Sequence, residues 1–165
     1  THVCSPAWNL EQDRGRPWSE AEALLIAEHP AHETNIRAFR KHWPEMVASE
    51  ISETVAIMRW LIESGVDVTL LTNFAADTFR EAQAMYPFLT ETRGVTVSGE
   101  VKVLKPDPQI YRIHTEDFSL DPAATLFIDD SAANVEGAKA FGWQAVLFEG
   151  PKKLRRDLSA FGLAV

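Results

Sequence analysis

The chain has 165 residues, of which 45% are hydrophobic, and a formal net charge of −8. This length and apolar content suit one globular domain with a proper core, and the acidic charge argues against a nucleic-acid partner. No apolar run approaches the roughly 18 residues of a membrane span and no signal peptide is recognisable, so we expect a cytoplasmic protein without a membrane partner, which the lone Cys4 also suits.

The first third of the chain reads as helices. "SEAEALLIAEHP" opens with Ser19 and carries Glu22 three residues later, a spacing that favours a capping box, and Pro30 closes the segment. "ETNIRAFRKHWP" has apolar residues at helical spacing before Pro44. We assign residues 1–48 to a small helical region.

From residue 49 onward helices and strands alternate. "SETVAIMRWLIESG" predicts a helix with Ser52 as N-cap and Gly65 as its stop, and "VDVTLLTN" predicts a buried parallel strand. Further helices are expected at "DTFREAQAMY", after "KPDPQIY", at "SAANVEGAKAFG" and at the C-terminus with Leu154, Leu158 and Phe161 on one face; further strands are expected at "GVTVSG", "TLFIDD" and "QAVLF". Residues 49–165 therefore predict an α/β, Rossmann-like core with a parallel sheet.

Polar side chains gather where the predicted strands end, which is where parallel sheets bind ligands. Thr72 and Asn73 follow one strand, Lys105 lies in "VLKPDPQIY", and Asp129 and Asp130 end another strand. A hydroxyl can donate to phosphoryl oxygens, a lysine can offset their charge, and a carboxylate can hold Mg²⁺. The three segments together predict a site for one phosphate and one divalent cation.

Each segment also has an ordinary structural interpretation. Thr72 and Asn73 are common turn residues, and Asp107 with Pro108 forms a typical helix start. Ser131 would serve as an N-cap, with the preceding acids favouring the positive end of the helix. A cap requires only one acid, so the conjunction of all three strand ends favours a functional site.

The motifs "LLTN", "KPDPQIY" and "FIDDSAANVEGAKAFG" resemble motifs two, three and four of the haloacid dehalogenase (HAD) superfamily, and the match runs over residues 66–142. The wording is most similar to sugar-phosphate phosphatases and to the N-terminal phosphatase domain of soluble epoxide hydrolases. The resemblance implies a Rossmann-like core with a small α-helical cap. It also implies a Mg²⁺-dependent phosphatase that acts on a small phosphorylated metabolite through an aspartyl-phosphate intermediate.

The resemblance assigns roles by position. Thr72 would bind the transferring phosphoryl group with Asn73 beside it, and Lys105 would steady the nucleophile and the phosphate. Asp130 would bind Mg²⁺ directly. Asp129 would contact the metal through a water molecule or would support the residues that bind it.

Less specific roles fall on four other residues. Asn134 would support the metal site from the following helix. In the cap, Trp43, Asp13 and Arg14 would touch the leaving group, although for Trp43 simple aromatic packing between cap and core is the favoured alternative.

The superfamily's first motif has no counterpart here. It has the form Asp-x-Asp and ends a strand that precedes the cap, where this chain has "CSPAWNLEQDRGRP". Asp67 lies at the wrong end of its strand, and Asp13 is placed in a polar loop. We therefore expect a sheet without its first, central strand, a partial cap at 1–48, and a chain that is inactive without an aspartate from elsewhere in a longer protein.

Two other functions remain open. A 2-haloacid dehalogenase-type hydrolase also uses an aspartate but needs no metal, so the retained acid pair counts against it. A non-catalytic HAD-like binding module would fit the missing nucleophile. A phosphorelay receiver is excluded because its acid pair precedes its Lys-Pro. Substrate identity and oligomeric state are not readable from the sequence.

Overall fold

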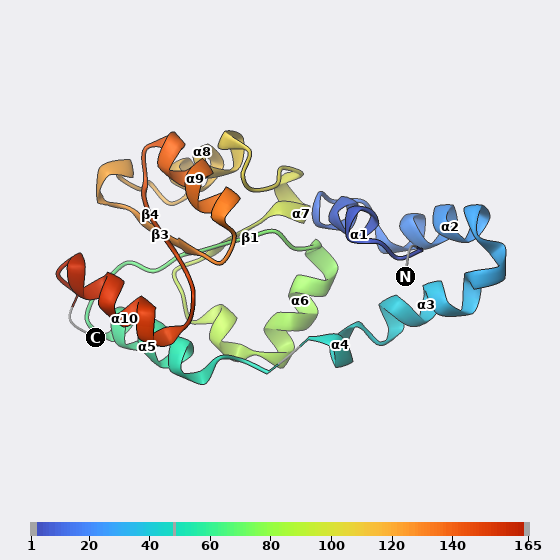
Figure 1. Cartoon of the computed structure of the whole chain (residues 1–165), viewed down its shortest axis with the longest axis horizontal. Coiled ribbons are helices and arrows are strands. Elements are labelled where there is room, and N and C mark those ends of the chain that lie inside the picture. The colour runs from blue at the N-terminus through green and yellow to red at the C-terminus, as the bar shows by residue number, and fades with distance from the viewer. Residues whose placement is uncertain (1–2, 48, 164–165) are drawn as a thin grey trace.

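The protein, seen in a computed structural model, is described over residues 3–47 and 49–163. Short helices form a lobe at one end, which we call the cap, beside a body of strands and helices (Figure 1). The cap comprises α1 (Pro6–Asp13), α2 (Trp18–Glu28), the short 3-10 helix η1 (Pro30–His32), α3 (Glu33–Lys41) and α4 (Trp43–Met46). This arrangement confirms the expected α/β fold with a small helical cap.

Helices and strands alternate through the rest of the chain. The helices are α5 (Ser52–Glu63), α6 (Ala76–Met85), η2 (Pro87–Thr90), α7 (Ser98–Val101), α8 (Pro108–Asp117), η3 (Pro122–Ala124), α9 (Ala132–Phe141) and α10 (Pro151–Ala160). The strands are β1 (Leu70–Thr72), β2 (Val95–Val97), β3 (Leu126–Asp129) and β4 (Gln144–Leu147). Every strand predicted from the sequence is present, but each is shorter than its apolar run.

The strands form two separate parallel pairs within the described residues. β1 pairs with β2 in the register Leu71 to Thr96, and β3 pairs with β4 in the register Ile128 to Val146. The strands are parallel, as predicted.

Helices cover the strands on two sides (Figure 1). Under α8 and α9 lies a cluster of Ile110, Tyr111, Phe127, Ala138 and Trp143. Between α5 and α10 lies a second cluster of Ile57, Leu61, Leu154 and Leu158. Each buried aliphatic or aromatic side chain contributes about 1.5–3 kcal/mol, so these two layers hold the strands in place.

A cavity of about 650 Å³ separates the two strand pairs. Its wall includes residues of β1 and β3 as well as side chains from both helical layers. Backbone groups of successive residues in a parallel strand point to alternate sides. The Leu70 N–H donates to the Gly94 carbonyl and the Phe148 N–H donates to the Asp129 carbonyl, so the backbone groups of Leu71 and Ile128 face away from their paired strands. The gap matches a sheet whose central strand is not among the described residues.

Several local predictions were wrong. Asp13 is the last residue of α1 and not part of a loop; Ser5 caps this helix by accepting from the Trp8 N–H. Ser19 and Ser52 lie inside their helices, which begin without a side-chain cap. Phe161 follows α10 and is 41% exposed, because the helix ends one residue earlier and the chain turns.

Other end signals are confirmed. Asp107 caps α8 by accepting from the Gln109 N–H at 2.9 Å, and Gly65 adopts a positive φ where α5 stops. None of the helices within 3–47 and 49–163 has both the length and the apolar character of a bilayer span.

Candidate active site

A buried ion pair joins the predicted lysine to the predicted acid pair. Lys105 Nζ donates to Asp129 Oδ2 at 2.6 Å, and the two side chains are 8% and 7% exposed. Lys105 Nζ also donates to the Leu71 carbonyl at 2.8 Å. Since Leu71 lies in β1 and Asp129 ends β3, the ammonium bridges the carboxyl edges of the two strand pairs.

The second oxygen of Asp129 is held by the start of α9. Asp129 Oδ1 accepts from the Ser131 N–H and from Asn134 Nδ2, both at 2.9 Å. The Ser131 side chain, expected to cap α9, makes no capping bond; Asp129 instead accepts from the Ser131 backbone and from the Asn134 side chain. These donors and Lys105 fix the carboxylate on both sides.

Tyr111 supports the same helix start from α8. Its hydroxyl donates to the Asn134 carbonyl at 2.8 Å. Burial, together with the negative charge of Asp129, raises the pKa of Tyr111 to about 12, so the hydroxyl stays neutral at physiological pH.

The Asn73 side chain makes two hydrogen bonds with the backbone of Lys105. Asn73 Nδ2 donates to the Lys105 carbonyl at 3.0 Å, and the Lys105 N–H donates to Asn73 Oδ1 at 2.8 Å. The peptide bond between Lys105 and Pro106 is cis. In this structure the Asn73 side chain is therefore engaged in positioning Lys105.

Thr72 and Asp130 are the sequence neighbours of the two residues that Lys105 Nζ contacts, Leu71 and Asp129. Thr72 follows Leu71 at the end of β1 and is partly exposed, and Asp130 follows Asp129 and is exposed. The structure thus brings Lys105 against the immediate neighbours of both residues at one edge of the strands. Their contacts with phosphate and metal stay predictions.

The cap residues have different surroundings. Arg14 pairs with Glu11 at 3.6 Å and its side chain is 50% exposed. The Trp43 ring meets the Phe74 ring edge-on at 5.8 Å between centroids, so its observed contact is packing between cap and core.

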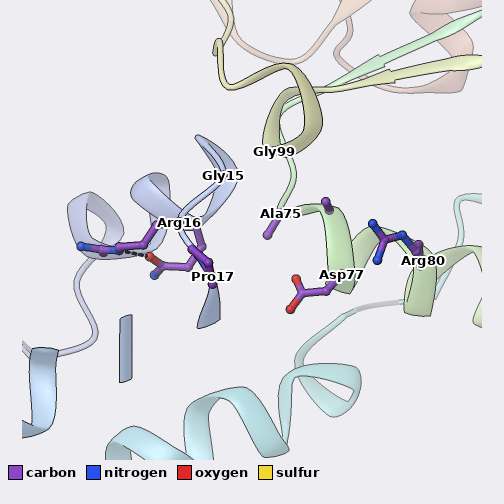
Figure 2. A pocket seen from close by; sticks show the side chains of 9 residues that line it. Gly15, Arg16, Pro17, Ala75, Asp77, Arg80 and Gly99 are labelled. Atoms are coloured by element: carbon purple, nitrogen blue, oxygen red, sulfur yellow. Dashed lines mark hydrogen bonds between the residues drawn. The ribbon is translucent and has the colours of Figure 1, made fainter. Parts of the chain in front are cut away.

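Asp13 lies at the junction of cap and core. Burial raises the pKa of its carboxyl to about 6, and a hydrogen bond from the Ala75 backbone N–H partly opposes this rise. A pocket of about 220 Å³ opens nearby, lined by the turn after α1 and the start of α6. Figure 2 shows Arg16 and Pro17 on one side of this pocket and Asp77 with Arg80 on the other.

Ser98 and Gly99 make the core side of that junction and were not predicted from the sequence. They follow β2 in "VTVSGE", so the rule applied to the other strand ends would have singled them out.

No group of three or more His, Cys, Asp or Glu side chains that could hold a metal occurs among the described residues. The donor chemistry still suits Mg²⁺, which commonly takes one or two carboxylates and completes its shell with water and phosphate oxygens. Asp130 is an exposed carboxylate in a suitable place, whereas Asp129 is committed to Lys105.

Curated relatives include two kinds of hydrolase. Phosphatase MT3486 of Mycobacterium tuberculosis is 31% identical over 103 residues, which cover 59% of this chain and 48% of that protein. (S)-2-haloacid dehalogenase 1 of a Pseudomonas species is 34% identical over 59 residues, 35% of this chain and 26% of that protein. The matched segments thus span about half or less of these relatives.

The fold is shared with solved HAD structures. A HAD family enzyme of Bacteroides thetaiotaomicron, in complex with magnesium and inorganic phosphate, aligns with a TM-score of 0.71 and 24% identity over 85% of this chain and 73% of that one. The sequence model of the haloacid dehalogenase-like hydrolase family matches residues 5–142 of this chain. With most of its length matched, this chain belongs to the haloacid dehalogenase-like hydrolase family.

Proposed function

We propose that this chain forms most of a Mg²⁺-dependent phosphatase that acts on a small organic phosphate in the cytoplasm. The observation that carries the proposal is the Lys105 ammonium, held between the Leu71 carbonyl and Asp129 at the shared carboxyl edge of β1 and β3. A fixed cation at this place can offset the charge on a phosphoryl group as it is transferred.

The attacking carboxylate would come from an extended apolar strand that enters between β1 and β3. The cavity there measures about 650 Å³ and is lined largely by apolar side chains, and the backbone groups of Leu71 and Ile128 face it. A parallel strand in this gap would hydrogen-bond to both edges. An aspartate at its carboxyl end would arrive beside Lys105.

The reaction would proceed in two displacements. A carboxylate oxygen attacks phosphorus, and the bond from phosphorus to the ester oxygen breaks. The departing alkoxide takes a proton from the second carboxylic acid of the incoming Asp-x-Asp segment, which regains one from the attacking water in the next displacement. Water then attacks the phosphorus of the aspartyl-phosphate, which releases inorganic phosphate and restores the carboxylate. The Thr72 hydroxyl would donate to the phosphoryl oxygens and Lys105 would balance their charge in both displacements.

Asp130 would hold the metal together with the incoming strand. When bound, Mg²⁺ would supply charge neutralisation of the phosphate oxygens. The phosphatase among the relatives supports this assignment, and so does the acid pair, which a carbon–halogen hydrolase does not need. The dehalogenase relative makes halide release the alternative activity.

The test combines the chain with a synthetic peptide of apolar residues that ends in Asp-x-Asp. We expect binding, together with Mg²⁺-dependent release of phosphate from p-nitrophenyl phosphate. A peptide ending in Asn-x-Asn should bind without supporting turnover. Lys105→Ala and Asp130→Ala should abolish turnover, whereas Lys139→Ala, an exposed lysine on α9, should leave it unchanged.

Three results would overturn the proposal. These are undiminished turnover in chelator, full activity of the Lys105 and Asp130 variants, or release of halide from 2-chloropropionate without phosphate release. The last result would assign the dehalogenase activity instead.

A further inference from the structure

Three backbone segments meet closely where the cap touches the core. They are the turn after α1, the residues after β1, and the residues after β2. A Cβ placed on Gly99 would lie 2.7 Å from the Ala76 nitrogen and 2.8 Å from the Phe74 carbonyl oxygen, and one on Gly15 would lie 2.8 Å from the Gly99 carbonyl oxygen. Figure 2 shows Gly15, Ala75 and Gly99 next to one another. Displacing any one segment must therefore press on the others.

One buried hydroxyl joins the cap to the core at this junction. Ser98 is 0% exposed, and its Oγ donates to the Asp13 carbonyl at 2.6 Å. The same oxygen accepts from the Phe74 N–H at 2.9 Å. The Gly99 N–H in turn donates to the Phe74 carbonyl at 3.0 Å. Both backbone groups of Phe74 are thus held from the Ser98–Gly99 segment, and the end of α1 is held with them.

Phe74 is one peptide bond away from the residue that holds Lys105. Asn73 bonds to the Lys105 N–H and carbonyl, and Lys105 Nζ bonds to Asp129. The path from the cap to the ion pair therefore consists of covalent bonds and hydrogen bonds of 3.0 Å or less. Ser98 is fully buried, whereas Asn73 and Phe74 are partly exposed.

We propose that Ser98 is a positioning residue that couples the placement of the cap to the placement of Lys105. Movement of the turn after α1 would shift Phe74 through the Ser98 hydroxyl, and the shift would pass through Asn73 to the Lys105 backbone. The importance of this coupling for catalysis rests on the proposed function, because it presumes that Lys105 meets the phosphoryl group. The coupling itself can be measured without a substrate.

The experiment compares Ser98→Ala with Thr96→Ala. Thr96 is a matched control because it lies in the same strand region, is 3% exposed, and uses its hydroxyl on the His114 ring at 2.8 Å, away from the cap. Amide hydrogen exchange of both proteins is followed residue by residue by NMR. Urea unfolding of each variant gives the global stability against which exchange rates are compared.

Loss of the Ser98 hydroxyl should accelerate exchange at three places in one variant: Phe74, Gly15 and the Lys105 N–H. About fivefold at Lys105 is expected, since losing a hydrogen bond worth on the order of 1 kcal/mol changes an equilibrium about fivefold. Thr96→Ala should leave Lys105 at its wild-type rate. Ser98→Cys, which keeps a weak donor of similar size, should restore part of the protection and serves if the alanine variant fails to fold.

The proposal fails if Lys105 exchanges at the wild-type rate in Ser98→Ala, or if Thr96→Ala accelerates it equally. The first result would confine Ser98 to local packing, and the second would reduce its effect to general loss of stability. Since no substrate, metal or peptide is added, a failed phosphatase assay would not affect either result.

Discussion

Replacing Lys105 by methionine should cost the fold about 3 kcal/mol. Removing one partner of a buried ion pair typically costs about 3–5 kcal/mol because the other charge is left uncompensated. Asp129 keeps its bonds from the Ser131 N–H and Asn134, which places the expected cost at the lower end of that range. For a chain of this size the change corresponds to a fall of roughly 6–12 °C in Tm.

The measurement is urea unfolding of the wild type, Lys105→Met, Asp129→Asn and the double variant at pH 7. The double variant should be more stable than Lys105→Met, because it contains no unpaired buried charge. Lys139→Met is the control: Lys139 and Glu136 form an exposed pair whose side chains are 49% and 71% accessible, so its loss should be barely measurable.

A Lys105→Met protein within about 1 kcal/mol of the wild type would refute this reasoning. So would a double variant no more stable than the single one. Either result would mean that water reaches the pair and that the two charges are not confined together.

Three further changes probe other parts of the fold. Burial lowers the pKa of His114 to about 4, so its contribution to stability is present above pH 6.5 and is lost as the pH falls toward 4. The stability advantage of the wild type over His114→Gln should therefore shrink by at most about 3 kcal/mol over that range. A constant difference would contradict the lowered pKa of His114. Gly99→Ala should cost about 1–3 kcal/mol in chemical unfolding, because its Cβ would lie 2.8 Å from the Phe74 carbonyl oxygen, whereas an unchanged midpoint would show that the junction is loose. Asp107→Ala should cost about 1 kcal/mol by thermal unfolding through loss of the bond to the Gln109 N–H, and Asp107→Ser should recover most of it.

The alternation of helices and strands was readable because it depends on local patterns. Apolar runs such as "TLFIDD" became the parallel strands, and Asp107 with Pro108 opened α8 as expected. The cap predictions failed at Ser19 and Ser52, which lie inside helices that begin without a side-chain cap. At α9, the Ser131 side chain makes no capping bond, and the Ser131 N–H itself donates to Asp129.

The sequence predicted that the site residues lie at one edge of the strands, but not which of their atoms bond to one another. The strand-end rule brought Thr72, Lys105 and the acid pair to one edge because parallel strands end together. Whether Lys105 pairs with Asp129 or with Asp130 depends on where the fold places its ammonium. In the structure the ammonium donates to Asp129. The sequence alone does not show whether the Asn73 amide contacts a phosphoryl group or the protein backbone. The fold turns this amide onto the Lys105 backbone.

By itself the sequence determined the order of the elements, the parallel strands and the three motif segments, because periodicity and turn chemistry act over a few residues. The gap in the sheet was expected from the missing first motif, but tertiary structure alone decided that Lys105 is buried against Asp129 and that Ser98 ties the cap to the core. Those features join residues 24 and 85 positions apart in the chain, and contacts over such separations follow from packing rather than from local pattern.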